Sequence, residues 1–279
     1  MRILVILASA AILSTMPVGA PLTAQAETLS LYTYADLADL ASAGSIVAAV
    51  EVRSAMRLRA GDAPGVAPGS TRFLMTADVV GLLKGAQGLP GQISWLADLP
   101  DVANRPVRIR RKTRFLLLAN PVEGQPGQVR LVAPQGQMTW DAALEQRLRA
   151  ILTESAAADA PPRVTGIGNA FHVPGAIPGE SETQIFLTTD DGRPVSLSIL
   201  RRPGEDPRWA VALAEMVDDS AAPPQRDTLL WYRLACFLPR ALPDSVIGDM
   251  SADDQAATRA DYQFVLDGLG GCARTIHQG

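Results

Sequence analysis

The sequence predicts an α+β fold that is mainly β, with a small barrel in the first half and an antiparallel sheet plus two C-terminal helices in the second. Short runs of valine, isoleucine and leucine recur through the 279 residues, separated by stretches rich in glycine and proline. The dipeptide Asp191-Gly192 lies between two such runs and indicates a tight hairpin. Runs with the apolar spacing of a helix are fewer, so strands should outweigh helices.

The first half is expected to begin with a short helix and to continue as strands. Thr33 can cap the helix, in which Leu37, Leu40 and Ala41 share one face, and Gly44 stands where a helix often ends. Turn-rich stretches then separate extended segments: Ile46–Val52, Arg72–Leu83, Gln92–Leu96, Arg114–Ala119 and Val129–Ala133. So many short strands in sequence indicate a small barrel or sandwich.

A helix and a linker are expected to end this half. Thr139 is the predicted N-cap, and Asp141 suits the positive first turn. The apolar stripe of this helix consists of Leu144, Leu148, Ile151 and Leu152. The alanine- and proline-rich stretch ESAAADAPPR follows, and such a change of composition is typical of a domain boundary. The predicted division is a signal segment 1–26, a barrel domain 27–156 with flanking helices, a linker 157–163 and a second domain 164–279.

The second half is expected to form an antiparallel sheet and then two helices. Its predicted strands are Val164–Val173, Thr183–Thr189, Val195–Leu200 and Trp209–Val217. The stretch DTLLWYRLACFLP favours a helix, because Leu230, Leu234 and Leu238 recur at every fourth position before Pro239. Ser251 is the predicted N-cap of the last helix, which should end at Gly270-Gly271.

The N-terminus has the pattern of a secretory signal peptide. Arg2 precedes the apolar stretch Ile3–Leu13, and the triplet Ala24-Gln25-Ala26 matches a cleavage site that ends at Ala26. The apolar stretch is shorter than the roughly 18 to 20 residues that a membrane span needs. We therefore expect a periplasmic or secreted protein with no membrane span in the mature chain.

The two cysteines, Cys236 and Cys272, are the only ones in the chain. In an oxidising compartment they would form a disulfide, and two buried free thiols are the alternative.

The chain offers little catalytic chemistry. It has two histidines, no G-x-S-x-G motif, no zinc-ligand spacing and no dinucleotide fingerprint, so we expect no metal and no cofactor. His172 and Glu215 are the only candidate catalytic side chains, and both have structural explanations. Strand alternation places Glu215 on the buried side, and Arg233 faces the apolar side of the next predicted helix. The favoured interpretation is a structural ion pair between Glu215 and Arg233, and the alternative is a carboxylate that serves acid-base catalysis.

The stretch RPVRIRRKTRFLLLA concentrates positive charge in a chain whose net charge is −4. Arg108, Arg110, Lys112 and Arg114 share one parity, which predicts one solvated basic face on a strand or its approach. Because the whole chain is acidic and exported, we expect no nucleic acid partner. If the first domain docks an acidic partner, these four cations are the predicted surface.

Four segments of the first half resemble the strand series of secreted OB-fold domains of the netrin and TIMP-like type. They are GSIVAAVEV, TRFLMTADVVGLLKG, TRFLLLANPVEG and QVRLVAPQGQMTW, within Thr33 to Trp140. The resemblance implies an OB-like barrel. It does not carry over metalloprotease inhibition, which depends on an N-terminal cysteine that this chain lacks before Cys236. The second half resembles only uncharacterised bacterial secreted proteins.

These features together predict an exported bacterial envelope protein that acts as a binding or interaction module, with an envelope protein or a small ligand as its partner. The alternative is a secreted hydrolase with a site in the second domain.

Overall fold

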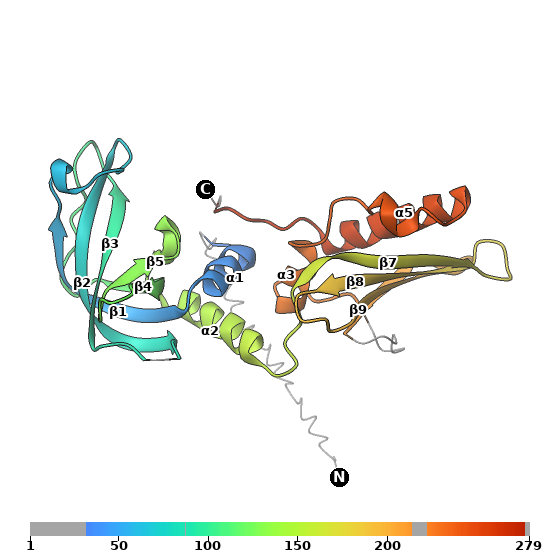
Figure 1. Ribbon diagram of the computed structural model, residues 1–279, viewed down its shortest axis with the longest axis horizontal. Helices are drawn as coiled ribbons and strands as arrows, with labels where there is room; N and C mark the ends of the chain where they lie inside the picture. Colours follow the sequence, from blue (N-terminus) through green and yellow to red (C-terminus); the bar gives the residue numbers. More distant parts are fainter. Residues whose placement is uncertain (1–31, 87, 214–221, 277–279) are drawn as a thin grey trace, which may run out of the picture. The chain divides into compact units, whose positions relative to one another are not determined.

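The structure, a computed structural model, describes residues 32–86, 88–213 and 222–276 (Figure 1). It is mainly β, with two antiparallel sheets and a few helices, as the sequence predicts. The predicted signal segment 1–26 and its cleavage site at Ala26 lie outside the described residues. In the described part of the chain, no helix combines the length and apolar character needed to cross a membrane.

The first sheet has the strand order β3-β2-β1-β4-β5, with β6 paired to β4 beside β5. Its strands are β1 (Ile46–Arg57), β2 (Ser70–Lys84), β3 (Gln92–Pro100), β4 (Arg114–Pro121), β5 (Val129–Leu131) and β6 (Gln137–Thr139). Among the described residues, a single parallel bridge from Ser94 to Gln128 links the β3 edge to the β5 edge. The sheet does not close, so the predicted barrel is not confirmed. Strand β5 has only three residues, so it offers few backbone groups for a ladder to β3.

Alternation along the strands gives the first sheet two buried faces. One face gathers Phe73, Met75 and Trp95 with Leu117 in an apolar cluster inside the curved sheet. The opposite face, which includes Leu116, packs against the helices α1 (Tyr34–Ala43) and α2 (Ala142–Ala156).

Side-chain caps decide where these two helices begin. Thr33 caps α1 as predicted, in a capping box with Asp36, and Gly44 ends the helix. The predicted N-cap of α2 is wrong, because Thr139 belongs to β6 and pairs with Phe115. Asp141 caps this helix instead, accepting hydrogen bonds from the first-turn backbone N–H groups at 2.8 and 3.1 Å.

The second sheet is a meander with the order β10-β9-β8-β7. Its strands are β7 (Val164–Pro174), β8 (Ser181–Thr189), β9 (Val195–Arg201) and β10 (Arg208–Ala212). Three helices follow: α3 (Leu229–Ala235), α4 (Asp244–Ile247) and α5 (Ala252–Leu269). The short helix α4 was not expected from the sequence. The predicted extension of the last strand to Val217 falls partly outside the described residues.

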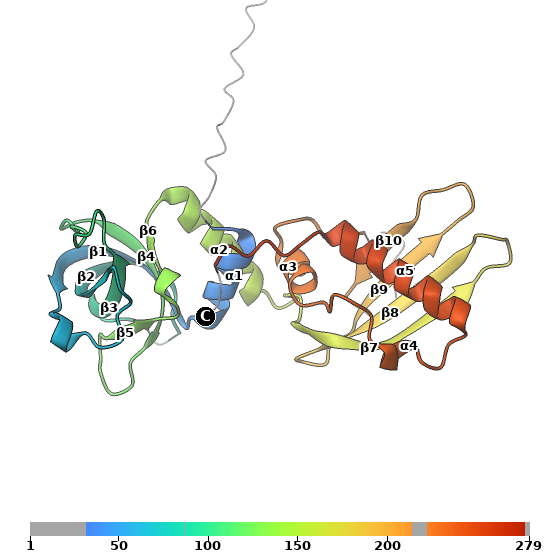
Figure 2. The same cartoon turned by 90° about the horizontal axis from the view of Figure 1, so that it is seen from above.

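Helix α5 lies across one face of the second sheet (Figure 2). Its approach to β10 is close, because a Cβ at Gly268 would stand 2.6 Å from Trp209 Nε1. The predicted linker joins α2 to β7, and one buried apolar cluster contains residues from both sides of it, among them Leu148 and Leu197.

Candidate functional site

A polar cluster is buried between the second sheet and α5. His172 on β7 lies beside Thr183 on β8, with 2.7 Å between Nδ1 and Oγ1. The Thr183 hydroxyl donates to Oδ2 of Asp261 on α5 at 2.5 Å, and Arg201 on β9 donates its Nε–H to Oδ1 at 2.6 Å. The Thr183 hydroxyl has one proton, and it donates this proton in its hydrogen bond to Asp261. In the contact between Thr183 and His172 the hydroxyl oxygen is therefore the acceptor, which requires the tautomer with a hydrogen on Nδ1.

The inner part of this cluster is closed to solvent, whereas the Arg201 side chain at its edge is 36% exposed. The exposed side-chain fraction is 7% for His172 and 1% for Asp261, and Thr183 is fully buried. The Asp261 carboxylate is compensated by the Arg201 guanidinium and by the hydroxyl, as a buried charge requires. Through these contacts, the polar cluster anchors α5 to the second sheet.

The structure therefore gives His172 partners that the sequence analysis missed. Asp261 precedes Val265 and Leu269 by one and two helical turns, which places it on the buried side of α5. That spacing was a signal for a buried carboxylate, but the sequence had no signal for which strands would face it.

The predicted pair of Glu215 and Arg233 stays a prediction, because Glu215 lies outside the described residues. Nε and Nη1 of Arg233 are buried and have no hydrogen-bond partner in the described part of the chain. The guanidinium lies over the Tyr232 ring, 5.5 Å from its centre, and burial lowers the pKa of Arg233.

Three of the four cations of the predicted basic face lie on the loop before β4 and Arg114 is the first residue of that strand, so the run is the approach to a strand, one of the two predicted alternatives. Residues 106–113 form no helix or strand, and β4 begins only at Arg114. Lys112 has φ 66° in a turn that ends the loop. The predicted alternation of burial nevertheless holds, because Val107 and Ile109 pack against the core while the cations are exposed.

Within the basic face, one of the four cations differs from the others. Arg114 lies 3.4 Å from Glu51 and stacks over the Trp140 ring at 5.5 Å. Arg108, Arg110 and Lys112 have no ion pair with any described residue and remain open to a partner.

An open groove of about 550 Å³ lies at one end of the first sheet. Three loops and the start of β1 line it, at residues 45–46, 85–86, 88–90, 121–122 and 124–129. Ile46, Leu89, Val122 and Val129 make much of its wall apolar, and the other lining residues are mostly glycine, proline and glutamine. We call this surface the loop groove. No motif marked it in the sequence, because it is formed where separate turns meet.

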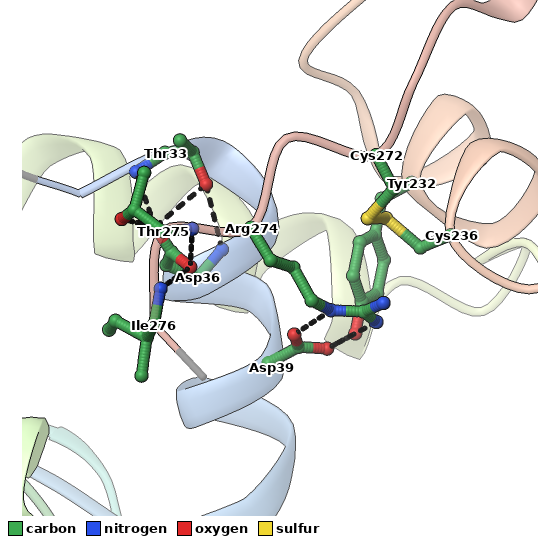
Figure 3. A network of polar contacts seen from close by, with 9 residues as sticks. All are labelled: Thr33, Asp36, Asp39, Tyr232, Cys236, Cys272, Arg274, Thr275 and Ile276. Atoms are coloured by element: carbon green, nitrogen blue, oxygen red, sulfur yellow. Dashed lines mark hydrogen bonds and ion pairs between the residues drawn. A yellow bond between two sulfur atoms is a disulfide. The ribbon is translucent and has the colours of Figure 1, made fainter. Parts of the chain in front are cut away.

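The last described residues, 270–276, form an extended segment that we call the C-terminal strap, and helix α1 holds its end (Figure 3). Asp36, which is 2% exposed, accepts hydrogen bonds from the backbone N–H groups of Thr275 and Ile276 at 2.9 and 3.0 Å and from the Thr275 hydroxyl at 2.6 Å. Two further bonds come from Thr33. Burial by itself would raise the pKa of Asp36, but these hydrogen bonds outweigh it and hold the pKa below its ordinary value.

A second carboxylate and the disulfide complete this attachment (Figure 3). Asp39 accepts a hydrogen bond from the Tyr232 hydroxyl at 2.6 Å and two more from N–H groups of Arg274 at 2.5 and 3.1 Å. Cys236 and Cys272 form the predicted disulfide, which joins the end of α3 to the strap. The sequence indicated the disulfide but not the two aspartates as anchors.

A pocket of about 540 Å³ lies beside the disulfide, and we call it the strap pocket. Its walls come from the end of α3 and the residues after it, from the last turns of α5 and from the strap. Charged side chains of both signs line it: Arg240, Asp267 and Arg274.

The candidate sites contain no evident metal centre, since no group of three or more His, Cys, Asp or Glu side chains in the described ranges could hold an ion.

In comparisons with known proteins, no family model matches this chain and no curated protein matches it. What the chain does must therefore be inferred from its own residues.

Proposed function

We propose that this chain is an exported bacterial envelope protein, periplasmic or secreted, that acts as a binding module for another envelope protein or a small ligand. The N-terminal pattern that ends at Ala26 supports export. The disulfide between Cys236 and Cys272 is compatible with an oxidising compartment.

The observation that carries the binding role is the loop groove. Its volume of about 550 Å³ falls in the range of ligand sites, and an apolar wall with a few polar groups is typical of them. Pro90, Pro121 and Pro126 fix the φ angle at three positions that line the groove, which reduces the conformational entropy that binding must overcome.

We further propose that the first sheet is an OB-like, partly open barrel of the netrin and TIMP-like kind. The strand order and the bridge from Ser94 to Gln128 support this, because a partly open barrel brings its two outer strands together. The loop groove lies next to that bridge, since Gln128 lines it.

Capture of partners from an envelope extract tests the binding role. Immobilised wild-type protein should retain one or more envelope components, and Val122→Asp should lose them because a charge would enter the apolar wall of the groove. Val173→Asp is the matched control, because Val173 is exposed on the second sheet. Equal capture by Val122→Asp and the wild type, with both folded by circular dichroism, would refute the role of the groove.

The alternative proposal is a secreted hydrolase that uses His172, and the contact with Asp261 through Thr183 favours it. An orienting carboxylate behind a histidine is a feature of nucleophilic catalysis. The Thr183 hydroxyl is too buried to attack a substrate, so the nucleophile would have to be water at the histidine. Ester, peptide and glycoside substrates should be cleaved by the wild type and not by His172→Ala or Glu215→Gln, and cleavage that survives both changes would exclude these residues.

A further inference from the structure

We propose that the strap pocket binds a small zwitterion, a free amino acid or a short peptide, whose carboxylate pairs with Arg240 and whose ammonium group pairs with Asp267. This site is separate from the loop groove and does not depend on the function proposed for that groove.

The size and floor of the strap pocket suit such a ligand. Its volume of about 540 Å³ lies in the range of small-molecule sites. Leu238, Leu266 and the half-buried disulfide give it an apolar surface on which an aliphatic side chain can pack.

The two charges that face the pocket are not neutralised by the protein. Arg240 is exposed and forms no ion pair or side-chain hydrogen bond with any described residue. Asp267 accepts one hydrogen bond from Gln263 Nε2 at 2.7 Å and pairs with no cation in the described ranges. The two side chains line the same pocket without forming an ion pair within 4.0 Å of each other. A ligand with one charge of each sign would satisfy both.

The surroundings of the pocket disfavour a ligand with a single charge. Helix α5 ends at Leu269, so the negative end of its dipole lies near Asp267, where it favours an ammonium group. A simple anion at Arg240 would leave the Asp267 carboxylate without a partner, and a simple cation at Asp267 would leave the Arg240 guanidinium without one. A molecule with one charge of each sign pairs with both side chains at once.

The wall formed by the strap is fixed before a ligand arrives (Figure 3). The disulfide holds Cys272, and Asp39 holds the Arg274 guanidinium through two hydrogen bonds. Asp36 then fixes the next two residues. Because Asp39 already neutralises Arg274, Arg240 is the cation left to pair with a carboxylate. A wall held in this way reduces the entropy that binding must overcome.

Isothermal titration of the oxidised full chain with the dipeptide alanyl-leucine tests the proposal. Its N-acetyl and C-amide forms each remove one charge, and each should bind about tenfold more weakly, which corresponds to about 1.4 kcal/mol for one lost charge pair. Arg240→Gln should lose the preference for the free carboxylate only, and Asp267→Asn should lose the preference for the free amine only.

Two controls make the result specific to this pocket. Arg202→Gln removes an exposed cation that does not line the pocket, and Val122→Asp alters the loop groove, so both should bind the dipeptide like the wild type. The proposal is overturned if no dipeptide form binds up to about 10 mM, a limit that corresponds to roughly 3 kcal/mol of binding free energy. It is also overturned if the blocked forms bind as well as the free one.

Discussion

Removal of the disulfide should cost this protein a large part of its stability. The bond between Cys236 and Cys272 spans a sequence separation of 36 residues. The loop-entropy model gives about 4 kcal/mol for a loop of this length, because the crosslink restricts the unfolded chain. Release of the C-terminal strap acts in the same direction, since Cys272 is covalently fixed two residues before Arg274.

Urea unfolding of the double variant Cys236→Ala/Cys272→Ala, followed by circular dichroism, measures this cost. The free energy of unfolding should fall by about 4 kcal/mol relative to the oxidised wild type. Treatment of the wild type with a dithiol reductant is the matched control, since it should produce a similar loss and leave the double variant unchanged. A loss below about 1 kcal/mol, or two alkylatable thiols in untreated protein, would contradict the reasoning.

Three further outcomes follow from the polar contacts. Asp261→Asn should lower the free energy of unfolding by about 1.5 to 3 kcal/mol, because an amide replaces the buried carboxylate in its charge-assisted hydrogen bonds while Arg201 stays partly solvated, and a loss below about 1 kcal/mol in urea unfolding would contradict a structural role. Asp36→Asn should flatten the acid side of the stability profile: the pKa of Asp36 is lowered on folding, so its contribution is fully present above the ordinary value of 3.8 and is lost as the pH falls through the lower folded-state value. An acid limb of unchanged steepness in pH-dependent unfolding would refute this. Arg110→Glu with Lys112→Glu should change the free energy of unfolding by less than about 0.5 kcal/mol, since both side chains are exposed, yet abolish capture of an acidic partner in the pull-down. Unchanged capture would remove the basic face as a docking surface.

Short-range signals in the sequence predicted the local structure well. Thr33 before an apolar stripe and Ser251 before another each mark a helix start that the structure confirms. Asp191-Gly192 lies in the expected connection between the antiparallel strands β8 and β9, with Gly192 at φ 76°, although that connection runs over residues 190–194 and is longer than a two-residue turn. In each case the contacts that form the cap or the turn join residues within a few positions of one another, so the local sequence is sufficient to predict them.

The same signals were misleading where pairing with a distant strand competes. The side chain of Thr139 could cap a helix, but its backbone pairs with Phe115 of β4 and so belongs to strand β6. The helix α2 begins after Asp141 instead. The alternating run before Arg114 has the period of a strand, yet these residues form a loop, because the turn at Lys112 separates them from β4. Only the last residues of the run bond to a strand, because the Lys112 N–H donates to the Val52 carbonyl oxygen and the Val52 N–H donates to the Thr113 carbonyl oxygen.

The sequence by itself determined the class of fold, most of the helices and strands, and which disulfide is possible, because a chain with two cysteines permits only one intramolecular pairing. Only the tertiary structure decided that Asp36 would hold Thr275, 239 residues away, and that Asp261 would meet Thr183 across 78 residues. It also decided that the first sheet would stay open and where the loop groove and the strap pocket would form. Periodicity tells which face of an element is buried, whereas the partner on that face depends on how all the elements pack together.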